Sequence, residues 1–378
     1  MKNPFQYGGV VRGEAFCNRK KEVEDLLRAV ENGEKLFVYS ERRFGKTSLI
    51  RYVLDKLPKK QYVSAYVDLW PTDGALSFSM TTAKAIAESM STRVEKTLDV
   101  AKSFFGRLAP SMTLNEEGRP ELAFGVRKFV EPGLELEEVL EAPGKIAKQG
   151  KLRVVIVFDE FQQILEYGGD KVERQLRSII QTQADVAYLF LGSRRHLIQR
   201  MFLDRSRPLY RAGGHYPLRP IEEKDWRPFI RKRFLDRGVK ISDEQIHAIC
   251  HLTEGHPFYT QHLCHVLWDA CGREEQITDG LIESAVNTVL AHESYAYTTF
   301  WESFPNNQRK FLKGLAFEPA GVKPFASDFV QRYGLRSASN AQRAIESLLE
   351  RDVIDRDNGS FMIVDRFFRI WVQKTQKG

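Results

Sequence analysis

Residues 38–49 read VYSERRFGKTSL, a run of basic residues and a Gly-Lys-Thr triplet that follow an apolar segment. It matches the phosphate-binding loop pattern G-x-x-x-x-G-K-[ST] at every fixed position except the first, where Ser40 replaces glycine. The first glycine shapes the turn that leaves the preceding strand, so serine costs about 1 kcal/mol if its φ is positive and little otherwise. Gly45, where a side chain would meet a phosphate group, is retained. The stretch therefore predicts a site for nucleotide phosphates.

The sequence on either side of this loop fits the same prediction. Residues 35–39 form a short apolar run that is typical of a buried parallel strand. After the loop, apolar residues recur at helical spacing on one face: Leu49, Ile50, Val53 and Leu54. A strand, a loop and a helix in this order direct backbone N–H groups and a helix N-terminus at phosphate oxygens. These flanks disfavour the alternative, a basic surface turn.

The residue types in the loop suit ATP and magnesium. We expect Lys46 to contact the β- and γ-phosphates, and so to serve catalysis, and the Thr47 hydroxyl to bind Mg²⁺. The residues expected to bind the nucleotide are Arg42, Arg43, Phe44, Gly45, Lys46, Thr47 and Ser48.

A second motif, a pair of adjacent acids, follows another apolar strand at residues 153–158. Beside the phosphate loop, Asp159 would hold the water shell of Mg²⁺, and Glu160 would polarise the attacking water. The alternative is an ordinary strand followed by an acidic helix cap. The presence of the phosphate loop favours the metal-binding and catalytic roles.

A third apolar strand, at residues 187–191, ends in Gly192-Ser193-Arg194-Arg195. Parallel strands end at one edge of a sheet, so Ser193 or Arg194 is placed to sense the γ-phosphate, and Arg194 is the stronger candidate. Six arginines lie between residues 194 and 211, and a solvated basic helix explains most of them. The candidates for an arginine finger that acts on a neighbouring subunit are Arg205, Arg207 and Arg211.

The complete pattern predicts an α/β fold, with a P-loop NTPase parallel sheet followed by a helical lid and a winged-helix domain. Residues 62–68 and 215–218 supply two more strands, and residues 105–134 are predicted to form an insertion with a β-hairpin, followed by a helix. The expected domains are an ATPase core at residues 1–221, a lid at residues 222–300 and a winged helix at residues 301–378.

The winged helix is predicted from three short helices followed by a hairpin. The helices lie at about residues 308–315, 326–333 and 340–350, and an Asn358-Gly359 turn joins two short strands. Residues 301–378 carry 13 basic and 9 acidic residues, a net charge of +4. The helix in the recognition position mixes Asn340, Gln342 and Arg343 with Glu346 and Glu350. Weak DNA binding and a regulatory or protein-contact role therefore stand as equal alternatives.

Composition places the chain among soluble globular proteins of two or three domains. It has 378 residues, of which 42% are hydrophobic and 28% charged. No apolar run approaches the roughly 18 residues of a membrane span, and the N-terminus lacks a signal-peptide core, so we expect no membrane contact. The four cysteines show no C-x-x-C spacing, which favours reduced thiols in the cytoplasm. A net charge of +7 permits nucleic-acid contact without requiring it.

Taken together, several motifs give the chain a resemblance to the archaeal-type P-loop ATPases of archaea and bacteria, which are related to the AAA+ and STAND ATPases. The resemblance spans essentially the whole chain, including the winged helix. The motifs that carry it are FCNRKKEVEDLL, SERRFGKTSL, VVIVFDEFQQI, LFLGSRRHLI, PLYRA, EGHPFYTQHLC and the ending FMIVDRFFRIWV.

The resemblance implies further site residues. The family's N-terminal F-x-G-R-E-x-E-L box would place Arg19 near the adenine, although Asn18 departs from the usual glycine. Origin-recognition-type ATPases open a lid helix with G-[DN]-x-R, whereas residues 255–258 read GHPF here and resemble the STAND group. Pro257 suits the first position of a helix. We expect residues 255–257 to contact the base and ribose and to link the nucleotide to the lid.

These observations predict an ATP-binding and ATP-hydrolysing switch of the STAND or AAA+ type, which couples the nucleotide to the lid and the winged helix. One alternative is an ATP-gated DNA-binding regulator that resembles a replication initiator. Another is a nucleotide-dependent scaffold in signalling or defence. The expected ligands are ATP or ADP with Mg²⁺, and the sequence leaves open whether the further partner is DNA, another protein or a second copy of the chain.

Overall fold

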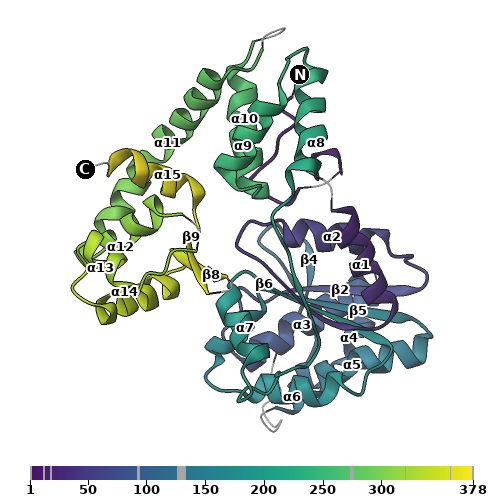
Figure 1. Ribbon diagram of the computed structural model, residues 1–378. Helices are drawn as coiled ribbons and strands as arrows, with labels where there is room; N and C mark the ends of the chain where they lie inside the picture. The colour runs from purple at the N-terminus through teal and green to yellow at the C-terminus, as the bar shows by residue number, and fades with distance from the viewer. Residues whose placement is uncertain are drawn as a thin grey trace.

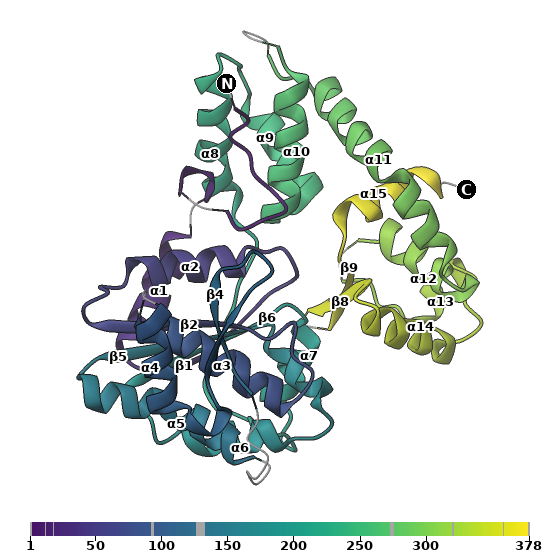
Figure 2. The same cartoon turned by 180° about the vertical axis from the view of Figure 1, so that it is seen from behind.

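The computed structural model describes residues 2–11, 13–17, 19–91, 94–125, 133–272, 276–319, 321–357 and 359–376. Two residues that entered the sequence predictions, Asn18 and Asn358, lie outside these ranges. The chain forms three parts (Figures 1 and 2): a sheet covered by helices, a group of helices beside the N-terminal segment, and a smaller part that carries the C-terminus.

A five-stranded sheet, in which every neighbouring pair of strands is parallel, forms the centre of the first part. The strand order is β2-β5-β6-β1-β7. The sequence predicted these five strands, and their presence confirms the α/β P-loop fold. Their bounds are β1 (Lys35–Tyr39), β2 (Tyr62–Asp68), β5 (Arg153–Asp159), β6 (Val186–Gly192) and β7 (Gly214–Pro217).

Helices cover both faces of this sheet (Figure 1), because successive residues of a strand point to opposite sides. In β1, Leu36 and Val38 pack on the face covered by α1 and α2, whereas Phe37 packs on the face covered by α3, α5, α6 and α7. The helices are α1 (Lys20–Glu31), α2 (Lys46–Lys56), α3 (Ala75–Met90), α5 (Leu134–Gly150), α6 (Lys171–Ile180) and α7 (Arg195–Leu203).

The carboxyl ends of three strands meet at one edge of the sheet. In the strand register, Asp159 at the end of β5 lies opposite Asp68, and Gly192 at the end of β6 lies opposite Tyr39. The phosphate loop follows β1, the acidic pair ends β5, and Ser193 follows β6. The topology therefore brings the three sequence motifs together, as parallel α/β sheets do at their ligand sites.

The segment between β2 and β5 also contains α4 (Val94–Phe104) and an antiparallel hairpin. The hairpin consists of β3 (Ser111–Leu114) and β4 (Pro120–Ala123), and it lies within the insertion predicted from the sequence. Residues 126–132 of that insertion are outside the described ranges. Short 3-10 helices occur at Gly13–Ala15, Gly106–Leu108 and Phe161–Tyr167.

The lid helices are α8 (Glu223–Asp236), α9 (Asp243–Thr253) and α10 (Pro257–Ala270). The N-terminal segment runs along them (Figure 1), although the sequence assigned it to the ATPase core. Phe5 is buried in their apolar core, with its ring 5.4 Å from that of Phe234. Asn3 donates a hydrogen bond to the carbonyl of His265 on α10. The N-terminal segment therefore connects the lid to the sheet.

The winged helix follows the long helix α11 (Asp279–Glu302). Residue 300, where the lid was expected to end, lies in the last turn of α11. The remaining elements are α12 (Asn306–Phe317), α13 (Ser327–Arg332), α14 (Ala338–Glu350), β8 (Ile354–Asp357), β9 (Ser360–Ile363) and α15 (Arg366–Thr375). The wing formed by β8 and β9 points toward α7 of the first part (Figure 2). In the described part of the chain, no helix has the length and apolarity needed to cross a membrane.

Candidate nucleotide site

A cavity of about 710 Å³ lies between the sheet edge, the N-terminal segment and the lid. One end is formed by the phosphate loop and by the strand-end residues of the sheet. The other end is formed by residues 6–11 of the N-terminal segment and by residues of α8 and α10. Its volume falls in the range of small-molecule sites in proteins.

The backbone of the phosphate loop explains why Ser40 is tolerated. Left-handed backbone conformations occur at Arg43 (φ 60°) and Gly45 (φ 80°), not at Ser40. Because the φ of Ser40 is not positive, replacing the usual glycine by serine at this position costs little free energy. The strained residue is Arg43, since a non-glycine residue in this region costs of order 1 kcal/mol.

Lys46 begins α2 and is buried in the floor of the site, with 5% of its surface exposed. Its ammonium group donates hydrogen bonds to the Glu41 carbonyl (2.9 Å) and to the Ser40 hydroxyl (3.1 Å). Burial lowers the pKa of Lys46 to about 8, and the carboxylates of Glu160 and Asp159 oppose that shift. The structure therefore holds a cation at the start of the helix, where a phosphate group would be stabilised.

Thr47 and Asp159 lie side by side, as the sequence predicted for magnesium ligands. The Thr47 hydroxyl donates to Asp159 Oδ2 at 3.0 Å, and the Tyr66 hydroxyl donates to the same oxygen. Asp159 Oδ1 accepts the backbone N–H of Glu160 at 2.9 Å. A hydroxyl and a carboxylate are the hard oxygen donors that Mg²⁺ prefers. The two residues therefore fit a Mg²⁺ ion at this end of the cavity.

Glu160 adopts a left-handed backbone conformation (φ 51°) directly after β5. Its Oε2 accepts a hydrogen bond from the Ser193 hydroxyl at 2.6 Å and another from the Gln162 side chain. These contacts join the acidic pair to the end of β6 and fix the position of the carboxylate. Glu160 and Ser193 both line the cavity, at the same end as Lys46 and Thr47.

Arg194, which the sequence suggested would face the γ-phosphate, instead contacts the winged helix. Its guanidinium pairs with Asp352 Oδ2 at 2.9 Å, and Arg42 of the phosphate loop pairs with the same oxygen at 3.2 Å. Asp352 lies between α14 and β8 of the winged helix and has a φ of 54°. Arg42 lines the cavity, whereas Arg194 does not contribute to its lining. Both arginines thus bind a carboxylate of the winged helix.

The lid contributes Pro257, Phe258 and Gln261 to the other end of the cavity. Pro257 occupies the first turn of α10, as expected. Gln261 is buried and ties the N-terminal segment in place, because it donates to the Ala15 carbonyl at 3.1 Å and accepts the backbone N–H of Gln6 at 3.1 Å. This end of the cavity is therefore assembled from segments about 250 residues apart in the sequence.

The lid also contacts the phosphate loop directly. His256 Nδ1 accepts the N–H of Phe258, so Nε2 carries the proton and donates to the Arg42 carbonyl at 3.2 Å. The Arg43 guanidinium lies 4.5 Å from the centre of the Phe258 ring. Gly255 (φ 63°) is required, because a Cβ there would lie 2.4 Å from the Ile221 carbonyl oxygen. Of residues 255–257, Pro257 reaches the cavity, whereas His256 reaches the loop.

Other predicted site residues have mainly structural contacts. Arg19 lines the cavity, but it donates to the carbonyls of Arg219 (2.8 Å) and Phe44 (3.4 Å). Ser48 accepts the backbone N–H of Val11 at 2.9 Å. Among the arginine-finger candidates, Arg207 pairs with the buried Glu173, whereas Arg205 and Arg211 are exposed.

Several cavity residues were missed by the sequence prediction. Tyr66 and Trp70 lie at and beyond the end of β2, and Tyr66 holds Asp159. The alternation of β2 (YVSAYVD) could have placed Tyr66 on one face of the sheet, but not beside a particular carboxylate. Residues 6–11 have no motif that marks them as cavity residues.

Comparison with known proteins agrees with this architecture. A family model described as "ATPase domain predominantly from Archaea" matches residues 16–263, and one described as "Probable winged helix domain" matches residues 295–374. The Walker-type ATPase PABY2304 of Pyrococcus abyssi is 16% identical, with a TM-score of 0.66 over 98% of this chain and 99% of that one.

A second solved structure has the same fold. The ORC2 protein of Aeropyrum pernix, determined as ADPNP–ADP complexes, is 13% identical, with a TM-score of 0.55 over 100% of this chain and 99% of that one. At these identities the likeness concerns the fold alone. Among curated proteins, none matches the sequence.

Proposed function

Because the chain belongs to the family of ATPase domains found predominantly in Archaea, we propose that its cavity binds ATP with Mg²⁺ and hydrolyses it to ADP and phosphate. The observation that carries this proposal is the grouping of Lys46, Thr47, Asp159 and Glu160 at one end of the cavity. A buried cation, a pair of hard oxygen donors and a fixed carboxylate are the parts that phosphoryl transfer to water requires.

Each of these residues has a defined task. Lys46 and the N–H groups of the loop hold the β- and γ-phosphates. Thr47 and Asp159 would hold Mg²⁺, which when bound offsets phosphate charge in the transition state. Glu160 orients the attacking water and accepts its proton, and Ser193 and Gln162 keep the carboxylate in place. Residues 42–48 and Pro257 complete the nucleotide contacts.

We further propose that the nucleotide sets the position of the winged helix. Arg42 and Arg194 both bind the Asp352 carboxylate, and Arg42 also lines the cavity. A γ-phosphate is a stronger anion than a carboxylate and would compete for these guanidinium groups. ATP would therefore weaken the hold on Asp352, and ADP would leave it intact. A ligand shifts a conformational equilibrium only through such a difference in affinity.

DNA binding through the winged helix is the second candidate function. Gln342 and Arg343 are exposed on α14, which leaves this face of the helix accessible. The same face carries Glu346, which accepts a hydrogen bond from Gln342 at 2.7 Å, and the exposed Glu350. Because phosphate contacts dominate DNA affinity, the acidic residues on this face favour weak DNA binding. They fit better a winged helix whose position changes with the bound nucleotide.

Glu160→Gln tests the proposed activity. The amide leaves the magnesium ligands and Lys46 intact but cannot accept a proton from water. We expect ATP affinity to change by less than about threefold, and phosphate release to fall by about 100-fold. Calorimetry and a phosphate-release assay measure the two quantities on one preparation. Unchanged turnover would remove Glu160 from the mechanism.

A further inference from the structure

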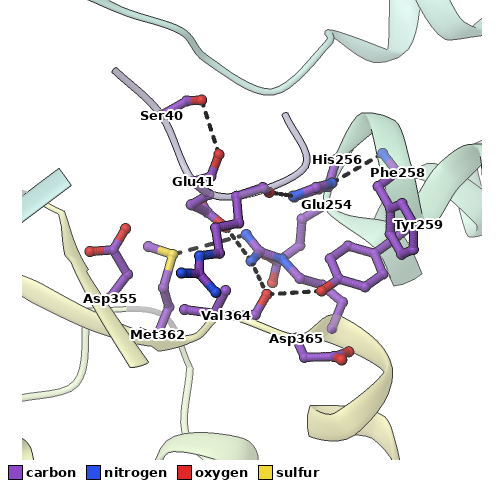
Figure 3. Close-up of polar contacts among 12 residues, drawn as sticks. Ser40, Glu41, Glu254, His256, Phe258, Tyr259, Asp355, Met362, Val364 and Asp365 are labelled. Carbon is purple, nitrogen blue, oxygen red and sulfur yellow. Dashed lines mark hydrogen bonds and ion pairs between the residues drawn. The ribbon is translucent and has the colours of Figure 1, made fainter. Parts of the chain in front are cut away.

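The back of the phosphate loop is joined to the winged helix by a buried cluster of charges. Glu41, the second residue of the loop, is 2% exposed, and Arg366, the first residue of α15, is also 2% exposed. The Arg366 guanidinium binds the Glu41 carboxylate, and it donates to the carbonyl of Val364 at 2.7 Å and to Glu254 of the lid at 2.9 Å. Figure 3 shows Glu41, Glu254 and Val364 near one another, and each of the three accepts a hydrogen bond from Arg366.

A second arginine completes the neutralisation of Glu41. Arg195, at the start of α7, is buried and donates to the other carboxylate oxygen of Glu41 at 2.9 Å. Burying a carboxylate is costly unless it is paired and hydrogen-bonded, and each of the two oxygens of Glu41 has a guanidinium partner. The core supplies one partner and the winged helix supplies the other.

Glu41 is also coupled to the phosphate end of the cavity. Its carbonyl accepts the hydrogen bond of Lys46, and its carboxylate is among the groups that counter the effect of burial on the pKa of Lys46. An unneutralised carboxylate at this position would repel the phosphate groups of a nucleotide. The ion pair that neutralises this carboxylate therefore involves a residue 325 positions away in the sequence.

We propose that Arg366 is a positioning residue for nucleotide binding: by pairing with Glu41, the docked winged helix keeps the phosphate loop receptive to a polyanion. Arg366 does not line the cavity, so it acts through Glu41. The inference rests on the proposed function, since it requires a nucleotide in the cavity. The docked winged helix would therefore raise nucleotide affinity, and its position would also respond to whether ATP or ADP is bound.

Thermodynamic linkage means that the Arg366–Glu41 contact must also let a bound nucleotide affect docking of the winged helix. If docking of Arg366 raises nucleotide affinity by some factor, a bound nucleotide favours docking by the same factor. ADP and ATP share this effect, because both carry the β-phosphate beside Lys46. The competition for Asp352, in contrast, concerns the γ-phosphate. Nucleotide release and γ-phosphate binding would therefore act on the winged helix through different residues.

The test is ADP binding by calorimetry to the full-length wild type and to three variants. Arg366→Gln leaves Glu41 with one partner, and we expect ADP affinity to fall by about tenfold or more. Glu41→Gln combined with Arg366→Gln removes the repulsive charge, and we expect affinity to return to within about threefold of wild type. Arg369→Gln is the matched control. It lies one turn further along α15 and binds Glu254, so its affinity should stay within about twofold of wild type.

The outcomes separate the inference from the proposed function. Wild-type protein that does not bind ADP would contradict the proposed function. Wild-type affinity in Arg366→Gln, or a double variant as weak as Arg366→Gln, would overturn the role of Arg366. If Arg366→Gln does not fold, Glu41→Gln alone decides. We expect it to have a lower Tm but ADP affinity equal to or above that of wild type, and a loss of affinity would overturn the proposal.

Discussion

The phosphate loop has two faces that are held in different ways. On the face toward the cavity, Lys46 and Thr47 bind groups of the loop itself and of the neighbouring strand β5. On the opposite face, Glu41 binds Arg366 of the winged helix, and Arg42, which also lines the cavity, binds Asp352. The cavity face carries the chemistry, and the other face carries contacts to a separate part of the molecule. Changes to the two faces should therefore affect different quantities.

Lys46→Ala should produce the largest effect, and it probes the cavity face. It removes the buried cation at the start of α2, so we expect ATP and ADP affinity to fall by about 100-fold or more. Lys56→Ala, at the exposed end of the same helix, is the control and should bind as wild type does. Calorimetry measures both variants. Equal binding by Lys46→Ala would show that the nucleotide lies elsewhere.

Arg194→Ala should produce an intermediate effect that is specific to one nucleotide. It removes a cation that the γ-phosphate would attract from Asp352, so ATP affinity should fall by about fivefold while ADP affinity is retained. Asp352→Asn should have the opposite sign and raise ATP affinity by a similar factor. Arg200→Ala is the control, because Arg200 is exposed on α7, the helix that begins directly after Arg194. If Arg194→Ala has the ATP-to-ADP ratio of wild type, the opposite face does not sense the γ-phosphate.

Phe258→Ala should produce a smaller effect that does not distinguish the nucleotides. Phe258 lines the cavity and packs against Arg43, but its ring cannot form an ion pair with a phosphate group. We expect ATP and ADP to weaken equally, by about threefold. The measurement is a pair of titrations on this variant. A selective loss of ATP binding would mean that the lid, and not the opposite face of the loop, distinguishes the two nucleotides.

The last effect is on stability and not on nucleotide affinity, and it concerns pH and the contact between lid and loop. Burial holds the pKa of His256 well below its usual value, and the charge of Arg366 adds to the effect. The unfolded chain therefore binds the proton first as the pH falls below about 6.5, so stability decreases on acidification by at most about 1.4 kcal/mol per pH unit for this group. His262, whose pKa burial lowers to about 4, acts in the same direction.

His256→Asn separates this contribution from the rest. Asparagine can still cap α10 but does not titrate, so we expect a lower Tm at pH 7.5 and a smaller loss of Tm between pH 7.5 and 5.5 than in wild type. His251→Asn, at an exposed position of α9, is the matched control. Thermal unfolding at a series of pH values provides the comparison. Parallel curves for wild type and His256→Asn would contradict the assignment.

The sequence predicted the cavity face far better than the opposite face, and the reason is physical. The strands β1, β5 and β6 could be found because both faces of a parallel sheet are buried, which makes each of these strands a short apolar run. The ends of such strands converge, so Lys46, Thr47, Asp159 and Glu160 could be placed together from spacing alone. These contacts are set by local chain geometry and by the strand order.

The opposite face depends on docking between distant segments, which no local pattern records. Arg366 follows Asp365, which caps α15 through two backbone N–H groups, so the pair reads as an ordinary helix start. Asp352 is an unremarkable acid in a turn after α14. Arg194 was correctly placed at a strand end, but its proximity to Asp352 depends on how the winged helix docks.

The distance between the ATPase core and the winged helix in each nucleotide state shows most directly whether the nucleotide sets the position of the winged helix. Spin labels on cysteines introduced at Gln181 and Gln331, both exposed, can be attached selectively because the four native cysteines are buried. In the Glu160→Gln background, we expect one distance distribution with ADP and a longer or broader one with ATP and Mg²⁺. Asp352→Asn should shift the ADP distribution toward the ATP one. Identical distributions with ADP and ATP, both at saturating concentration, would contradict a nucleotide-set position of the winged helix.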